Sequence, residues 1–273
     1  MFFIIHKQDE LYSYERIISL APAITEMLYS LDLGENILGV TTYCNFPEDA
    51  KSKEKIGEFS YINIEKIILL KPDLIFASGG VQEKYAKILQ DLKFNIEIIY
   101  PQNIEGIFNS LERIGELTDT KRKAEKLISQ SRTRLNIIKA ETENIPKDER
   151  TRVFIEMWDE PLTTAGSKSF INQIISMAGG NNIADKIQYP YPRISPEFVI
   201  LNDPQIILIA YNYDRKNNNL NEEVKLRPGW KNVSAVKYGR IITDFDPDIL
   251  LRESLRIVDA VEKLHDLLYL KAN

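Results

Sequence analysis

Aromatic side chains and prolines gather in the loops that follow the apolar segments of this sequence. Residues 42–47 carry Tyr43 and Phe46 just before a proline, and residues 189–193 place Tyr191 between two prolines. Rigid aromatic rings offer a large contact area at a low entropic cost, and proline restricts the backbone that presents them. Loops of this kind suit a large, flat, partly apolar ligand.

Histidine and cysteine, by contrast, are scarce. The 273 residues include two histidines, His6 and His265, and one cysteine, Cys44. A single cysteine excludes an intramolecular disulfide and a cysteine-cluster metal site. Two histidines near opposite ends of the sequence disfavour a histidine-rich metal site or a Ser-His-Asp triad. We therefore expect no metal site and no catalytic residue, and we expect Cys44 to be buried rather than reactive.

Net charge and hydropathy argue against a nucleic-acid-binding protein and against a membrane-spanning one. Lys and Arg number 35 against 40 Asp and Glu, a net charge of −5, whereas nucleic-acid binding usually needs a basic excess. No apolar run approaches the roughly 20 residues of a transmembrane helix. The apolar start at residues 2–5 is too short for a secretory signal. With residues 11–12 it has the pattern of a small hairpin. Two alternatives therefore stay open: Met1 is the native start, which would place the protein in the cytoplasm, or a leader has been removed.

Short apolar segments alternate with helical patterns along the chain. Strands are expected at residues 17–20, 37–40, 74–77, 96–100, 153–155, 206–209 and 240–243, and helices at 25–33, 170–177 and 254–270. This alternation predicts an α/β fold with parallel-rich sheets covered by helices. A longer helical pattern at 120–143 lacks Gly and Pro and would extend about 36 Å. We predict an N-terminal α/β lobe at 1–118, a connecting backbone helix at 119–146 and a C-terminal α/β lobe at 147–273.

The two predicted lobes share a local sequence pattern. Residues 63–76 align without gaps on residues 195–208, and both segments read as a capping residue, a glutamate, a short helix, a proline and a buried strand. This match indicates two similar lobes. Ligands of α/β sheets bind beyond the carboxyl ends of the strands. The strand-end loops of both lobes are therefore expected to line one cleft.

Several motifs together resemble the helical-backbone (class III) substrate-binding proteins of ABC importers, and most closely their cobalamin-binding branch. They are R-I-I-S-L-A-P-A-I-T-E at 16–26, Y-x-x-F-P at 43–47, the unit at 63–75, W-D-E-P-L-T-T-A-G at 158–166, G-G-N-N-I at 179–183 and R-P-G-W at 227–230. The resemblance implies a bilobed, monomeric, non-enzymatic transport protein without a catalytic cofactor. It also implies a corrinoid in the cleft as the transported ligand, permease subunits as partners and a location outside the cytoplasmic membrane.

The resemblance also implies which side chains bind the ligand. The candidate ligand-binding residues are Pro22, Tyr43, Phe59, Ser78, Gly79, Trp158, Tyr191, Arg193 and Asp248. Phe59 and Tyr191 are aromatic where the cobalamin-binding pattern has tryptophans, and Ser78 is not. Glu65 and Glu197 match the paired surface glutamates that dock on permease arginines. Each also follows a helix start, where a negative charge favours the helix dipole, so both roles can coexist.

Three other functions fit parts of the sequence. An iron–siderophore or haem could use Arg193, Arg252 and the loop tyrosines. Capture of a metal ion would need several converging histidines. A carboxylate-based hydrolase would need two facing acids, and the candidates are Asp159, Glu160, Asp244, Asp246 and Asp248.

Overall fold

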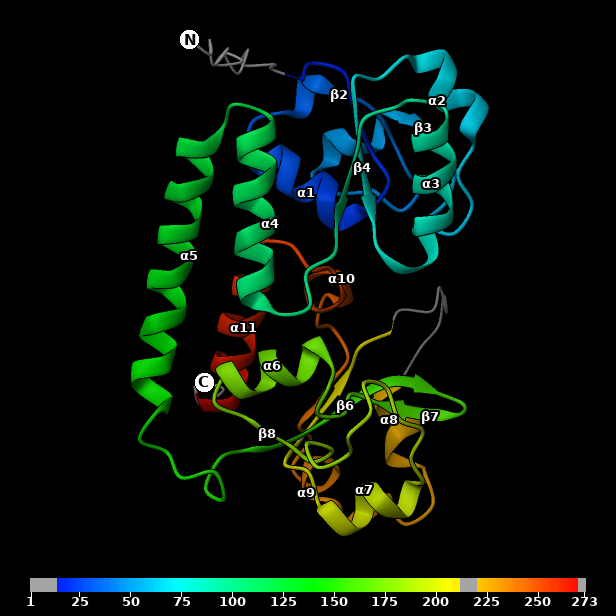
Figure 1. Cartoon of the computed structure of the whole chain (residues 1–273). Helices are drawn as coiled ribbons and strands as arrows, with labels where there is room; N and C mark the ends of the chain where they lie inside the picture. Colours follow the sequence, from blue (N-terminus) through cyan, green and yellow to red (C-terminus); the bar gives the residue numbers. More distant parts are fainter. Residues whose placement is uncertain (1–13, 212–219, 270–273) are drawn as a thin grey trace, which may run out of the picture. The chain divides into compact units, whose positions relative to one another are not determined.

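The computed structural model describes residues 14–211 and 220–269 (Figure 1), and the described residues form two compact units. Unit 1 contains residues 14–101 and 105–129. Unit 2 contains residues 102–104 and 130 onward. The helix α5 (Lys121–Thr142) begins in unit 1 and ends in unit 2, which confirms the helix predicted at 120–143. The hairpin predicted over residues 2–12 lies outside the described residues.

Unit 1 contains a five-stranded sheet in the order β3-β2-β1-β4-β5, and all its strand pairs are parallel. The strands are β1 (Ile17–Ser19), β2 (Ile37–Val40), β3 (Glu54–Lys55), β4 (Leu74–Ser78) and β5 (Ile96–Ile99). The sequence predicted four of them. It missed β3, a two-residue edge strand of polar side chains that has no apolar signature.

Helices cover the sheet of unit 1. They are α1 (Pro22–Ser30), α2 (Ile64–Leu70), α3 (Glu83–Asp91) and α4 (Ile104–Leu117). Ile67 of α2 and Leu89 of α3 pack on Ile18 and Ile75 of the sheet to form a buried core. Figure 1 shows α2 and α3 on one side of the strands and α1 on the other. The helix α1 begins at Pro22, three residues before the predicted start, because proline is favoured in the first turn of a helix.

Unit 2 contains the sheet β10-β9-β6-β7, with β8 also paired to β6. The strands are β6 (Arg152–Asp159), β7 (Leu162–Thr164), β8 (Asn181–Asn182), β9 (Ile206–Ile209) and β10 (Ile241–Ile242). The pairs are parallel except β6–β7. This hairpin prolongs β6 well beyond the predicted residues 153–155. Trp158 therefore lies in the strand and not in a loop after it.

The helices of unit 2 are α6 (Phe170–Met177), α7 (Pro196–Asn202), α8 (Leu220–Lys225), α9 (Ser234–Lys237), α10 (Pro247–Leu251) and α11 (Ile257–Tyr269). The bounds of α6 are those predicted. The rings of Phe154 and Trp230 meet edge to face at 6.0 Å in a core that includes Val199 of α7. Within the described residues, no helix combines the length and the apolar character needed to cross a membrane.

The predicted duplication is visible in the backbone. The helices α2 and α7 both have seven residues. Asn63 caps the first by accepting from the Lys66 amide, and Ser195 caps the second by accepting from the Phe198 amide. Both helices end on a left-handed residue, Lys71 at φ 48° and Asp203 at φ 41°. The aligned segments therefore share caps, length and exit geometry.

Candidate ligand-binding site

The strand-end loops of unit 1 bring its predicted ligand residues to one edge of the sheet, because parallel strands all end at the same edge. Pro22 follows β1 and starts α1. Tyr43 lies in the loop after β2, and Phe59 lies after β3. Ser78 is the last residue of β4, and Gly79 follows it. The structure thus gathers all five residues at the carboxyl edge of this sheet.

A buried glutamine that the sequence did not single out connects three of these loops. Gln82 Oε1 accepts a hydrogen bond from the Ser78 amide at 2.7 Å. Its Nε2 donates to the carbonyls of Leu20 at 2.6 Å and Phe59 at 2.9 Å. The side chain is fully buried, so its hydrogen bonds are protected from competing water. Gln82 therefore fixes the loops after β1, β3 and β4 relative to one another.

The loop after β2 is anchored by the cysteine. Cys44 is buried, as predicted, and its Sγ lies 3.2 Å from the hydroxyls of both Thr25 and Thr41. Tyr43 and Phe46, on either side of it, are exposed. The buried thiol holds the loop, and the neighbouring rings point outward.

Gly79 has a packing role that requires the absence of a side chain. A Cβ atom at this position would lie 2.6 Å from the ring of Tyr100. The close approach of that ring explains glycine here, and it leaves only the backbone of Gly79 for contact with a ligand.

In unit 2, Trp158 and Asp248 line one cavity of about 420 Å³. Trp158 comes from the end of β6 and Asp248 from α10. Tyr211 lines the same cavity and follows β9 by two residues. Its position after an apolar strand could have identified it from the sequence. The remaining lining residues are Met157, Ala210, Asp246, Pro247 and Leu251.

The two carboxylates of this cavity are each paired with an arginine. Asp248 lies 2.7 Å from Arg252, and Asp246 lies 3.0 Å from Arg256. The side chains of Asp248 and Asp246 are 37% and 43% exposed, whereas those of Arg252 and Arg256 are 11% and 18% exposed. The carboxylates therefore face the cavity, and the more buried arginines support them.

The loop that carries Tyr191 and Arg193 is held against β7. The Thr164 amide donates to the Pro192 carbonyl at 3.1 Å, and the Ile194 amide donates to the Leu162 carbonyl at 2.9 Å. Tyr191 and Arg193 are exposed. Neither residue belongs to the lining of the 420 Å³ cavity. The loop thus presents them beside the β6–β7 hairpin, where Arg193 pairs with Thr163 and Thr163 pairs with Trp158.

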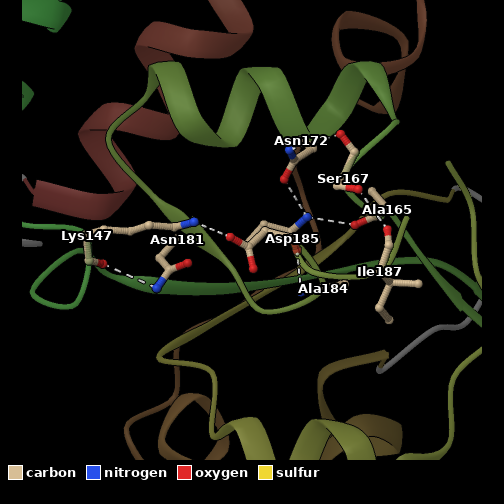
Figure 2. Close-up of polar contacts among 9 residues, drawn as sticks. Lys147, Ala165, Ser167, Asn172, Asn181, Ala184, Asp185 and Ile187 are labelled. Carbon is tan, nitrogen blue, oxygen red and sulfur yellow. Dashed lines mark hydrogen bonds and ion pairs between the residues drawn. The ribbon is translucent and has the colours of Figure 1, made fainter. Parts of the chain in front are cut away.

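The G-G-N-N-I motif supplies the anchor of that same loop (Figure 2). The buried Asn182 donates from Nδ2 to the carbonyl of Ala165 at 2.7 Å and to Oδ1 of Asn172 at 2.9 Å. Its Oδ1 accepts from the Ala184 amide at 3.1 Å. Ser167 Oγ then donates to the Ile187 carbonyl at 2.9 Å. The motif is therefore structural, and it fixes the segment that leads into residues 189–193.

Glu65 and Glu197 occupy equivalent places as the second residues of α2 and α7, and both are exposed. The carboxylate of Glu197 accepts hydrogen bonds from its own backbone amide and from the Ser195 hydroxyl, and these lower its pKa. Across residues 14–211 and 220–269, neither glutamate takes part in an ion pair. Both carboxylates are therefore open to an external partner.

The histidine that the structure describes is not part of the candidate ligand-binding site. His265 is buried, and its ring nitrogens contact the carbonyl of Ala178 at 3.1 Å and the carboxylate of Glu141 at 2.9 Å. His6 lies outside the described residues. Across the described chain, no three His, Cys, Asp or Glu side chains converge on a common point. Of the acids considered for a hydrolase, Asp246 and Asp248 do share a cavity, but each is neutralised by its arginine.

Known proteins share both the sequence and the fold. A family model described as "Periplasmic binding protein" matches residues 17–247. The uncharacterized ABC transporter substrate-binding lipoprotein YvrC of Bacillus subtilis is 32% identical over 260 residues, which cover 93% of this chain and 80% of that protein. The vitamin B12-binding protein of Vibrio vulnificus is 32% identical over 251 residues, covering 92% of this chain and 88% of that protein.

A solved structure from Staphylococcus epidermidis, a possible iron-binding (periplasmic solute-binding) protein, has a TM-score of 0.80 and 30% identity. The match covers 94% of this chain and 99% of that one. Proteins of this class work outside the cytoplasm with a small-molecule ligand and permease subunits, and they are not enzymes. The chain therefore belongs to the periplasmic binding protein family, as the substrate-binding component of an ABC transporter.

Proposed function

We propose that this chain binds cobalamin or a related corrinoid and delivers it to the permease of an ABC importer. The observation that carries the proposal is the cavity of unit 2, where the aromatic rings of Trp158 and Tyr211 stand beside the carboxylates of Asp246 and Asp248. The proposed ligand-binding residues are Pro22, Tyr43, Phe59, Ser78 and Gly79 in unit 1, and Trp158, Tyr191, Arg193 and Asp248 in unit 2.

The charges of the cavity favour an amide-bearing ligand. An ionised carboxylate only accepts hydrogen bonds, so Asp246 and Asp248 can accept from the primary amides that surround a corrin ring. The propionates of haem would instead need exposed cations, and the arginines paired with Asp248 and Asp246 are mostly buried. Trp158 and Tyr211 add the apolar surface that a flat macrocycle requires. The similarity to the vitamin B12-binding protein of Vibrio vulnificus supports the same ligand class.

A second candidate ligand is an iron–siderophore or haem. It is favoured by the exposed Arg193 and by the similarity to the possible iron-binding protein of Staphylococcus epidermidis. Arg252, which could also have served an anionic chelate, is mostly buried behind Asp248. The burial of Arg252 therefore favours the corrinoid over an anionic ligand.

Isothermal titration calorimetry of the wild-type chain with cobalamin, cobinamide, haemin and a ferric siderophore tests the proposal. We expect heat with one or both corrinoids and a smaller response or none with the iron ligands. Trp158→Ala should weaken corrinoid affinity by about tenfold, the amount expected when one aromatic contact is lost. Binding of haemin or the siderophore in place of the corrinoids would favour the second candidate. The absence of heat with all four ligands would exclude both.

Delivery requires a contact with the permease, and we propose that Glu65 and Glu197 provide it. Two carboxylates at equivalent places in two similar units allow a two-point contact with arginines, and such charge pairs accelerate encounter. We further propose that the protein acts as a monomer, which light scattering of the purified chain would test.

A further inference from the structure

A fully buried carboxylate contacts Tyr211, one of the two aromatic residues that line the unit 2 cavity. Glu156 belongs to β6, two residues before Trp158, and its side chain has no solvent exposure. Arg227 contacts it with both terminal nitrogens, at 2.5 and 2.7 Å. The Tyr211 hydroxyl donates to Glu156 Oε1 at 2.7 Å. A buried charge is costly unless it is paired and hydrogen-bonded, and here both conditions are met.

Tyr211 and Arg227 both keep their protons beside Glu156. Burial and the adjacent Glu156 carboxylate raise the pKa of Tyr211, so its hydroxyl keeps its proton and acts as the donor. Burial opposes the charge of Arg227, but the Glu156 carboxylate outweighs that effect and raises its pKa. Arg227 also lies over the ring of Trp230, 4.7 Å from the centroid. The Arg227 guanidinium therefore remains charged, and the Tyr211 hydroxyl remains the donor of its hydrogen bond to Glu156.

The Tyr211 ring connects the buried Glu156–Arg227 pair to the cavity. This ring lies 6.4 Å from that of Trp158, with 54° between their planes. Trp158 Nε1 donates to the carbonyl of Glu160 at 2.9 Å. Each ring thus has a polar contact at its edge that restricts its orientation, and both rings line the cavity. Two rings held in this way lose little conformational entropy when a ligand packs on them.

We propose that Tyr211 contacts the transported ligand as the partner of Trp158, and that Glu156 and Arg227 are positioning residues that fix the orientation of its ring. This inference rests on the proposed function, because it concerns how the same macrocyclic ligand is held. It adds a binding residue and two buried supports that the resemblance did not assign.

Two substitutions at one position separate contact from orientation. Tyr211→Ala removes the ring, and we expect corrinoid affinity to fall about tenfold. Tyr211→Phe keeps the ring and the Glu156–Arg227 pair but removes the hydrogen bond that orients the ring. We expect this variant to lose a smaller part of the affinity and to unfold near the wild-type urea midpoint. The control is Tyr238→Phe, which changes an exposed tyrosine at the C-terminal end of α9.

The two tryptophans of the chain supply an optical measurement of orientation. Trp158 is 44% exposed and Trp230 is fully buried, so acrylamide quenches mainly the emission of Trp158. We expect Tyr211→Phe to alter this quenching without ligand, whereas Tyr238→Phe leaves it unchanged. The inference is overturned if wild type binds corrinoid and Tyr211→Ala binds it equally well, or if quenching in Tyr211→Phe equals that of wild type. A wild-type chain that binds none of the four ligands overturns the proposed function itself.

Discussion

Arg16 and Arg152 hold equivalent positions in the two units and make the same contact. Arg16 Nε donates to the carbonyl of Lys71 at 3.0 Å, and Arg152 Nε donates to the carbonyl of Asp203 at 2.8 Å. Lys71 and Asp203 are the left-handed residues that end α2 and α7. The last carbonyls of a helix have no partner within the helix. Each arginine satisfies the one at the left-handed residue, and Arg16 also donates from Nη2 to the carbonyl of Leu70 at 2.5 Å.

The same arginines are also tied through their backbone. The Arg16 amide donates to Asp73 Oδ1 at 3.0 Å, and the Arg152 amide donates to Gln205 Oε1 at 2.9 Å. Asp73 and Gln205 stand at matching places in the aligned segments. The duplication therefore extends from the helix caps to the arginine at the start of β6 and the arginine just before β1.

The arginine contacts predict a stability effect. Arg152→Ala should lower the free energy of unfolding by about 1–3 kcal/mol, the cost of leaving such a carbonyl and charge unpartnered. Arg16→Ala should have a smaller effect, because Arg152 alone also pairs with a carboxylate, that of Asp203 at 3.0 Å. Urea denaturation followed by circular dichroism measures both variants. Arg122→Ala, at an exposed site on α5, is the control, and equal midpoints for Arg152→Ala and Arg122→Ala would contradict the prediction.

Gln82 predicts a loss of affinity from a residue with no ligand contact of its own. Gln82→Ala leaves the Ser78 amide and two carbonyls without their partner and loosens three loops, so we expect corrinoid affinity to fall about tenfold for a loss near 1.4 kcal/mol. Gln82→Glu keeps an acceptor for Ser78, but at neutral pH it cannot donate to Leu20 or Phe59. Calorimetry measures both variants.

The matched control for Gln82 is Gln90→Ala, which changes an exposed glutamine of α3. It should bind as wild type does. If Gln82→Ala and Gln82→Glu also retained full affinity, the three hydrogen bonds would be irrelevant to the ligand surface.

The paired glutamates predict a separation of transport from binding. A chain with both Glu65→Ala and Glu197→Ala should keep its ligand affinity but lose stimulation of uptake by the permease, because the charges that steer encounter are gone. Uptake of labelled corrinoid into vesicles containing the importer is the measurement. The control pair, Glu35→Ala with Glu143→Ala, removes two other exposed glutamates, one from each unit. If uptake stayed normal after both Glu65 and Glu197 were replaced, their role would be limited to stabilising the first turns of their helices.

Glu253 predicts a pH-dependent effect on stability. Burial raises the pKa of this carboxyl above its ordinary value of 4.5, so the folded state binds the proton more tightly than the unfolded state does. Its favourable contribution is present below pH 4.5 and is lost as the pH rises through the folded-state pKa. Glu253→Gln should therefore raise the urea midpoint at pH 7, and the gain should vanish near pH 4. Glu149→Gln, at an exposed site, should give no such trend.

Features set by neighbouring residues could be predicted from the sequence. Asn63 and Ser195 cap their helices through contacts three residues away, so the duplicated unit was recognisable from spacing alone. The length of β6 was not, because it depends on pairing with the short strand β7. Because of this pairing, Trp158 lies within β6 and not after the predicted strand.

The supports of the candidate site were harder to predict, because their partners are distant in the sequence. Gln82 reaches back 62 residues to Leu20, and Arg227 reaches back 71 residues to Glu156. No local pattern marks Gln82 for such a role, and the R-P-G-W motif marks Arg227 without indicating its partner. The candidate ring of Trp158 could be named from the sequence, whereas Tyr211 and the residues that hold its ring required the fold.

The burial of Cys44 makes the chain its own reporter of local opening. A thiol reagent reaches this sulfur only when the loop after β2 separates from Thr25 and Thr41, so the labelling rate measures the free energy of that opening. Because the adjacent Tyr43 belongs to the proposed ligand surface, a bound ligand should slow the labelling. One natural cysteine thus allows occupancy to be followed kinetically in a chain with no engineered probe.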